Sequence, residues 1–154
     1  MKYVHTVHCS VFVKPEEIQE SPKIRSAIST ALQELTGLDF AQEKLAVTTT
    51  KVEGFNNRAI EIFTVVLAKE AHTNHFLEHL CAALNQDQKE LLWEQKESRL
   101  DDELNFYIRL GKKELLRGKY DITDSGDCVH IKMHIAAFPK KREAALDVVR
   151  KIFA

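Results

Sequence analysis

Two stretches near the end of the chain decide the fold: LNFYIRL at residues 104–110 and VHIKMHIAA at residues 129–137. In both, an apolar side chain takes every second position, and mostly polar or aromatic side chains take the positions between. Successive side chains of a β-strand point to opposite faces. Each stretch therefore predicts a strand with one face on the core and one face in water. The wet faces carry Tyr107, Arg109 and Lys132.

A third strand is predicted near the start of the chain. Residues 3–13 alternate between apolar and polar side chains in the same way, and Pro15 follows as a strand breaker. Strict alternation places His5 on the same face as Val7.

The middle of the chain predicts a hairpin. Residues 45–52 are rich in Val and Thr, and residues 59–67 form an almost continuous apolar run that is typical of a central strand. The turn-forming residues at 54–57 join these two strands. One more short strand is expected over residues 120–123.

Helical spacing of apolar residues marks the other segments. Ser21 and Pro22 predict the start of a helix, and Gly37 predicts its end. Further helices are expected over residues 69–84, over residues 87–98 and after Pro139.

The predicted order of elements is β-α-β-β-α-α-β-β-β-α. Strands that follow one another through short turns favour a largely antiparallel sheet with helices packed on it, so we predict an α+β fold. The length of 154 residues fits one domain, residues 1–154.

The composition is that of a globular protein with almost no net charge. Lys and Arg number 22 and Asp and Glu number 23, which gives a formal charge of −1 at pH 7. This balance excludes a protein that coats nucleic acid through bulk positive charge and leaves a local basic patch as the alternative. No apolar run approaches the roughly 20 residues of a membrane span, and the alternating start is unlike a signal peptide. Three cysteines without a CxxC pair favour reduced thiols and a cytoplasmic location.

Two side-chain patterns are compatible with catalysis. Residues 75–79 match the H-x-x-E-H pattern of one class of zinc peptidases, and His72 lies one turn earlier. A pattern this short is weak evidence for a zinc site, and a solvent-exposed helix face explains the same residues equally well. Cys128 and His130 share a strand face, but a free cysteine is usually a small buried hydrophobe. We therefore predict no catalytic residue, no bound metal and no cofactor.

A local basic patch is predicted at the start of the last helix. Residues 140–142 read KKR, where positive charge opposes the helix dipole and stability alone would favour acidic residues. Cations beside free backbone N–H groups form an anion site instead. With the wet strand faces and a second basic cluster at residues 112–119, this pattern suits single-stranded RNA, whereas a solvated rim of lysines is the alternative. The candidate RNA-binding residues are Tyr107, Arg109, Lys112, Lys132, Lys140, Lys141 and Arg142.

Residues 101–112 and 129–143 also resemble the two hallmark blocks of one archaeal family. The first block has the pattern D-x-x-L-N-x-Y-x-R-x-x-K, and the second is a strand ending in A-[YF]-P-x-K-R-E. The chain resembles the archaeal RNA-binding proteins described as predicted exosome subunits, whose α+β fold resembles that of a large-subunit ribosomal protein. The hairpin turn at residues 54–60 lacks the Pro and the His pair that many members carry. The matching positions are Asn105, Tyr107, Arg109, Lys112, Pro139, Lys141, Arg142 and Glu143.

The resemblance implies a non-catalytic RNA-binding accessory protein, linked to the exosome or to other RNA processing, with RNA and RNA-processing proteins as partners. The alternative is a protein–protein adaptor or a homodimer without direct RNA contact. The long first strand motivates that alternative, because a strand at a sheet edge can pair with another chain.

Overall fold

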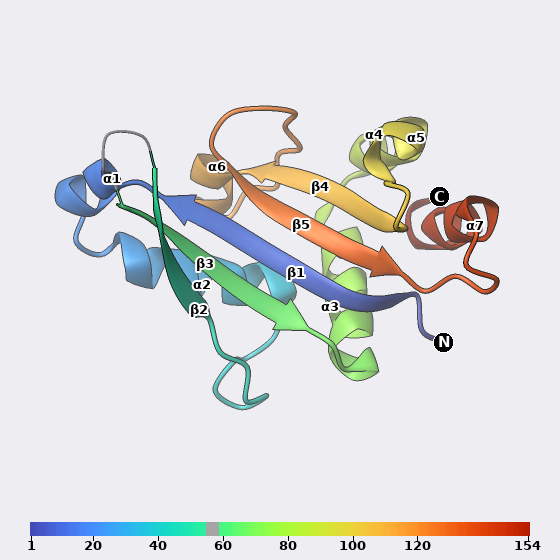
Figure 1. Ribbon diagram of the computed structural model, residues 1–154, viewed down its shortest axis with the longest axis horizontal. Helices are drawn as coiled ribbons and strands as arrows, with labels where there is room; N and C mark the ends of the chain where they lie inside the picture. The colour runs from blue at the N-terminus through green and yellow to red at the C-terminus, as the bar shows by residue number, and fades with distance from the viewer. Residues whose placement is uncertain (55–58) are drawn as a thin grey trace.

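The computed structural model describes residues 1–54 and 59–154 and confirms the α+β fold (Figure 1). Within these residues, five strands form one antiparallel sheet in the order β2-β3-β1-β5-β4. The first strand lies at the centre of the sheet and the edges are β2 and β4, so the first strand has no free edge for the pairing with another chain that motivated the adaptor or homodimer alternative. The strands are β1 (Val4–Val13), β2 (Thr48–Glu53), β3 (Ala59–Leu67), β4 (Asn105–Gly111) and β5 (Cys128–Ile135).

Seven helices occur in the same described residues, and they follow the predicted order with refinements. The helix after Pro22 begins at Ile24 and ends before Gly37, whose φ of 70° is the left-handed conformation that favours glycine. None of the seven has the length and apolar character needed to cross a bilayer. The helices are α1 (Pro15–Glu20), α2 (Ile24–Thr36), α3 (Glu70–Ala83), α4 (Gln86–Glu94), α5 (Lys96–Arg99), α6 (Lys112–Leu116) and α7 (Arg142–Phe153).

Three local expectations change in the structure. The helix expected over residues 87–98 is divided into α4 and α5 at Gln95. The short strand expected over residues 120–123 is a single bridge between Ile122 and Leu110. The turn expected at residues 54–57 lies, apart from its first residue, outside the described residues.

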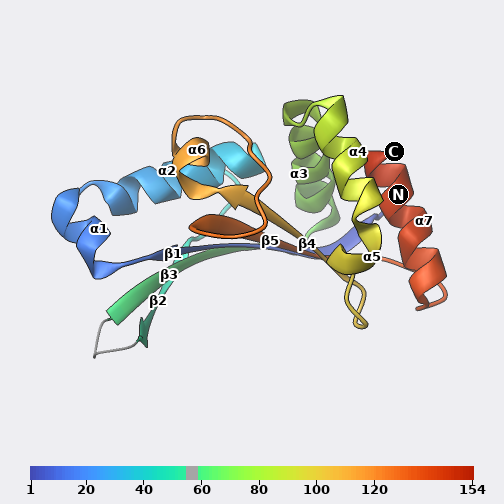
Figure 2. The same cartoon turned by 90° about the horizontal axis from the view of Figure 1, so that it is seen from above.

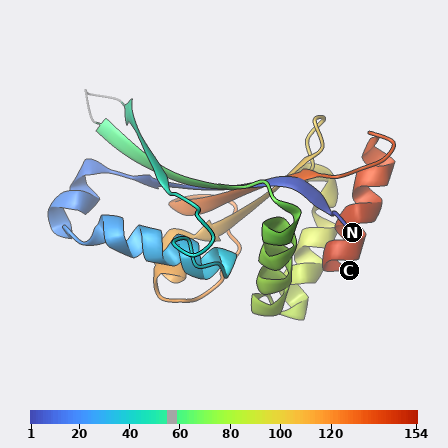
Figure 3. The same ribbon diagram turned by 90° about the horizontal axis from the view of Figure 1, so that it is seen from below.

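The sheet is covered on one face only. Figures 2 and 3 show the helices on one side of the sheet, while the turn at residues 101–104 and the loop at residues 136–141 project on the other side. The core lies between the helices and the covered face, where Leu32 of α2 and Phe76 of α3 belong to the same buried cluster as Val11 of β1. We call the uncovered side the open face.

A β-bulge in β1 explains why strict alternation fails near its start. The register between β1 and β5 shifts between Val4 and Thr6, which is how one extra residue enters an antiparallel pair. Val4 is therefore fully buried on the covered face. The expectation that His5 shares the face of Val7 is wrong, because the ring of His5 lies 5.2 Å from that of His134, between centroids, on the open face.

The two edges of the sheet differ. Along β4, the carbonyl of Tyr107 accepts a hydrogen bond from Arg99 at 3.2 Å, and the carbonyl of Arg109 accepts one from the backbone N–H of Thr123 at 2.9 Å. Side chain and loop thus satisfy backbone groups that an edge strand would otherwise leave to solvent. All six residues of β2, in contrast, are exposed.

Candidate nucleic-acid interface

The open face carries a row of side chains that crosses four strands. Tyr107 of β4 pairs with Lys132 of β5, Lys132 pairs with His8 of β1, and His8 pairs with Val66 of β3. Lys132 is exposed, and Tyr107 is 38% exposed. Adjacent strands are about 5 Å apart, so Lys132 lies between two positions that carry rings, Tyr107 on one side and His8 on the other.

A second row runs parallel to the first. Arg109 of β4 pairs with His130 of β5, and His130 pairs with Ser10 of β1. The ring of Phe12 lies 5.6 Å from that of His130, between centroids, and 45% of Phe12 is exposed. The open face thus alternates cationic, aromatic and imidazole side chains over the central strands.

The histidines of the open face have lowered pKa values. Burial, followed by the charge of Lys132, lowers the pKa of His8, and burial followed by the charge of Arg109 lowers that of His130. Burial is also the main cause of the lowered pKa of His5. Since an ordinary histidine pKa is near 6.5, these imidazoles are neutral at pH 7, and the permanent positive charges of the two rows are Lys132 and Arg109.

Asp101 fixes the orientation of Tyr107. The Tyr107 hydroxyl donates to Oδ2 of Asp101 at 2.9 Å, and Oδ1 accepts from the backbone N–H of Asn105 at 2.8 Å. Although burial alone would raise it, hydrogen bonds from Asn105, Tyr107 and Glu103 hold the pKa of the Asp101 carboxyl below its ordinary value. The start of the first family block is therefore a hydrogen-bonded turn that holds an exposed aromatic ring.

Lys112 is not on the surface. It is 1% exposed, and its Nζ donates to the carbonyl of Phe12 at 2.8 Å. The same Nζ lies 2.8 Å from Oε2 of Glu17 and 2.8 Å from Oδ2 of Asp127. The ammonium group of Lys112 is enclosed by partners of the protein itself, which counts against the expectation that Lys112 contacts RNA.

Arg142 joins two helices. Its Nη2 donates to the carbonyl of Glu97 at 2.7 Å, and its Nη1 donates to the carbonyl of Leu100 at 2.9 Å. The Glu97 carboxylate completes the arrangement, 3.1 Å from Nη2. The guanidinium group therefore holds the start of α7 against the end of α5, while a phosphate contact of Arg142 stays a prediction.

Lys140 and Lys141 remain on the surface, in the loop at residues 136–141. Both are exposed, and Phe138 in the same loop is 98% exposed. Lys140 lines a hollow of about 320 Å³ together with Asp101, Asp102, Glu103, Leu104, His134 and Arg142, so carboxylates partly balance its charge. This loop joins an exposed aromatic ring to two lysines at the end of the open face.

The two basic clusters of the sequence do not share a surface. Lys113 belongs to α6, beside the start of β5 and on the covered side, whereas Lys140 and Lys141 follow the end of β5 (Figure 3). The eight residues of β5 separate these ends by roughly 25 Å.

The histidine pattern on α3 makes structural contacts. Nε2 of His72 lies 3.1 Å from Oε2 of Glu43, and Nε2 of His75 lies 2.8 Å from the carbonyl oxygen of Gly37. Within residues 1–54 and 59–154, no group of three His, Cys, Asp or Glu side chains is arranged to hold a metal ion.

The thiols are poor nucleophiles. Cys9 is fully buried, and burial raises the pKa of its thiol to about 12. The Sγ of Cys128 lies 3.5 Å from Nε2 of His130, but burial again raises the thiol pKa. A thiol with a raised pKa carries little of the thiolate that nucleophilic catalysis needs.

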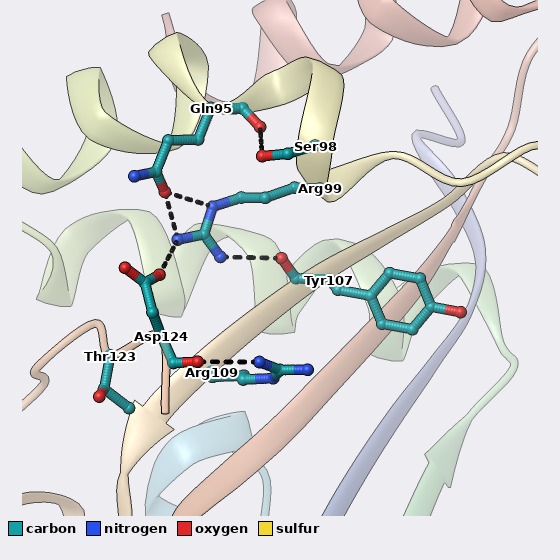
Figure 4. A pocket seen from close by; sticks show the side chains of 7 residues that line it. All are labelled: Gln95, Ser98, Arg99, Tyr107, Arg109, Thr123 and Asp124. Atoms are coloured by element: carbon teal, nitrogen blue, oxygen red, sulfur yellow. Dashed lines mark hydrogen bonds and ion pairs between the residues drawn. The ribbon is translucent and has the colours of Figure 1, made fainter. Parts of the chain in front are cut away.

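Sequence reasoning missed Arg99. This residue of α5 is 9% exposed, and its guanidinium group reaches across to β4 (Figure 4). A basic residue in the last turn of a helix is usual, so nothing in the sequence distinguishes Arg99 from a surface arginine.

The chain is similar to known proteins over nearly its full length. A family model described as RNA binding matches residues 6–135. The RNA-binding protein PAB1135 of Pyrococcus abyssi (strain GE5 / Orsay) is 25% identical over 147 residues, which cover 96% of this chain and 92% of that protein.

Solved structures agree with the fold. Protein AF2318 from Archaeglobus fulgidus has a TM-score of 0.81 at 22% identity, with 99% of each chain covered. Mth689, a DUF54 protein from Methanothermobacter thermautotrophicus, has a TM-score of 0.74 at 22% identity, also with 99% of each chain covered. At these identities the likeness supports the fold.

The buried position of Lys112 leads to a prediction about stability. Replacing Lys112 with Met leaves two carboxylates facing each other and the carbonyl of Phe12 without its donor. We expect the free energy of unfolding in urea to fall by about 3 kcal/mol, as for other broken buried ion pairs. Lys113→Ala, at an exposed position on α6, should stay within about 0.5 kcal/mol of the unmodified protein. Equal stability of the two variants would contradict the structural role of Lys112.

Proposed function

The chain belongs to the RNA-binding family whose model spans most of it, and from this premise we propose that it binds single-stranded RNA across the open face. The observation that carries the proposal is the row of Tyr107, Lys132 and His8 on a sheet face that none of the described helices covers. Membership of the family also confirms the resemblance found in the two sequence blocks.

The chemistry of the open face matches that of a single-stranded ligand. Unpaired bases stack on aromatic rings, and phosphates pair with cations. Tyr107 and Phe12 offer exposed rings, and Lys132 and Arg109 stand beside them. Phe138 and Lys141 extend the same chemistry beyond the end of β5.

The finer assignment is an accessory role in RNA processing, with the exosome as a candidate partner. The resemblance of residues 101–112 and 129–143 to predicted exosome subunits supports this part of the proposal. The three cysteines are free thiols, which supports action in the reducing cytoplasm. The raised thiol pKa values favour binding over catalysis.

Removing charge from the open face should weaken RNA binding. We expect Lys132→Ala to raise the Kd for a single-stranded oligoribonucleotide about fivefold to tenfold, because one phosphate contact is lost. The double variant Lys140→Ala/Lys141→Ala should also raise the Kd for this oligoribonucleotide. Fluorescence anisotropy, repeated over a range of salt concentrations, measures both Kd and the number of phosphate contacts.

The matched control for Lys132→Ala is Lys113→Ala, which removes the same charge from α6, a helix on the covered side (Figure 2). It should leave the Kd nearly unchanged, and the thermal midpoints of all variants should agree. Equal weakening by Lys113→Ala would show a diffuse electrostatic effect and would remove the open face from the proposal.

The lowered histidine pKa values predict how binding depends on pH. Below pH 6.5 the imidazoles of His8 and His130 begin to take up protons, which adds positive charge next to the RNA. An added ion pair contributes up to about 1 kcal/mol, so affinity should rise roughly fivefold as the pH falls from 7 toward 5. The variant His8→Gln/His130→Gln should lose most of this rise in the same anisotropy assay.

The stability of the free protein should change in the opposite direction. A histidine with a lowered pKa binds fewer protons in the folded state than in the unfolded state. Its contribution is therefore fully present above the ordinary histidine pKa of about 6.5 and is lost as the pH falls from there through the lower pKa of the folded state. If the stability of the protein falls at low pH as expected but the affinity for RNA does not change with pH, an RNA site at His8 and His130 is contradicted.

Self-association is a second candidate function, and the exposed β2 favours it. All six residues of this edge strand are exposed, and such an edge can pair with another chain. Lys51 on the same strand opposes pairing, as charged edge residues do. Light scattering at micromolar concentration decides: a mass of 17.7 kDa contradicts a homodimer, and twice that mass supports it.

A further inference from the structure

A polar cavity of about 430 Å³ lies at the outer edge of β4 (Figure 4). Of the residues that line it, only Tyr107 and Arg109 have been assigned to RNA binding above. One wall comes from α5 and its junction with α4, another from the middle of β4, and the third from the loop before β5. The residues that line it are Gln95, Ser98, Arg99, Tyr107, Arg109, Thr123 and Asp124.

Arg99 enters the cavity as a desolvated cation with mainly neutral partners. Its Nε donates to Oε1 of Gln95 at 2.9 Å, and its Nη1 donates to the carbonyl of Tyr107 at 3.2 Å. The nearest carboxylate is that of Asp124, whose Oδ1 lies 3.6 Å from Nη2, too far for a hydrogen bond. The guanidinium group is therefore held rigidly while its charge is only loosely balanced.

A second arginine faces the same cavity. Nη1 of Arg109 donates to the backbone carbonyl of Asp124 at 3.0 Å, which is again a neutral acceptor. Burial lowers the pKa of Arg99, the charge of Asp124 opposes this shift, and the charge of Arg109, which lines the same cavity, adds to it. Among the residues that line the cavity, two cations therefore face one carboxylate, and that carboxylate is 84% exposed.

We propose that this cavity binds a phosphate group of the RNA, held between the guanidinium groups of Arg99 and Arg109. Arginine presents a planar set of donors that matches phosphate geometry, and such charge-assisted hydrogen bonds are stronger than neutral ones. A phosphate also removes the repulsion between the two arginines. It displaces the Asp124 carboxylate, which is free to turn toward solvent.

The position of the cavity continues the path across the open face. Tyr107 and Arg109 belong both to the cavity and to the two rows of the sheet. A strand of RNA that crosses Lys132 and Tyr107 reaches the edge of β4 at this point. The inference rests on the proposed function and adds Arg99, Asp124 and a defined phosphate position to it.

Two substitutions with opposite expected signs test the inference. Arg109→Gln should raise the Kd for a short oligouridylate about tenfold, the effect of one charge-assisted hydrogen bond, and should reduce the log–log salt slope by about one. Asp124→Asn removes the competing carboxylate at nearly constant shape, so it should lower the Kd about threefold. Fluorescence anisotropy and thermal midpoints, which should stay unchanged, are the measurements.

The matched control for Asp124→Asn is Asp121→Asn, which changes charge in the same loop at a residue that does not line the cavity. It should change the Kd less than Asp124→Asn does. If Arg109→Gln and Asp124→Asn both bind like the unmodified protein while Lys132→Ala binds more weakly, the phosphate site is overturned and RNA binding along the row of Tyr107, Lys132 and His8 stands. If the unmodified protein binds no RNA even at low salt, the proposed function fails, and this inference fails with it.

Oligouridylates that carry a 5′-hydroxyl, a 5′-phosphate or a 3′-phosphate identify which phosphate enters the cavity. Sensitivity to Arg109→Gln with all three supports an internal phosphodiester, and sensitivity with one phosphorylated end only supports a terminal phosphate. Equal affinities of Arg109→Gln and the unmodified protein for all three overturn the inference.

Discussion

The enclosed ammonium group of Lys112 is the interaction on which the geometry of the sheet depends. It joins the last residues of β1, through the carbonyl of Phe12, to α1, through Glu17, and to the loop before β5, through Asp127. Lys112 itself follows β4 directly, and its backbone N–H donates to the carbonyl of Asp127 at 3.1 Å. Taking a charge out of water is expensive unless its partners are well placed, so this contact permits few alternative arrangements. It fixes how β1, β4 and β5 lie against one another at this end of the sheet.

That register decides what the open face presents. A slip of one residue would turn every side chain of a strand to the other face, and Lys132 would enter the core while Ile131 met water. With the register fixed, Tyr107, Lys132 and His8 lie side by side. The helices bury one face of the sheet and leave the open face to solvent, which is a common arrangement in antiparallel sheets. The surface that can contact RNA thus follows from the same contacts that stabilise the fold.

The alternating stretches predicted β4 and β5, and with them the outward positions of Tyr107, Arg109 and Lys132. Periodicity is reliable here because each strand has a buried face and a wet face. Lys112 could not be predicted, because the sequence around it reads as a solvated basic cluster and its partner Glu17 lies 95 residues away. The bulge beside His5 was equally hidden, since an inserted residue leaves no compositional signal. For Arg142, the sequence could not distinguish an RNA-binding arginine from a structural one, because only coordinates show that its guanidinium group already binds Glu97 and Leu100.

The two edges of the sheet have a consequence for assembly. The loop before β5 and Arg99 occupy backbone groups along β4, whereas β2 presents its whole length to solvent. Strand addition can therefore take place on one side only. If two molecules joined through β2, the contact would be a self-complementary two-fold one. The outer edges of the joined sheet would then be the two β4 strands, whose backbone groups are already occupied. Growth would end at two copies, so the arrangement that seats the Arg99 side chain also keeps the protein from polymerising through its sheet.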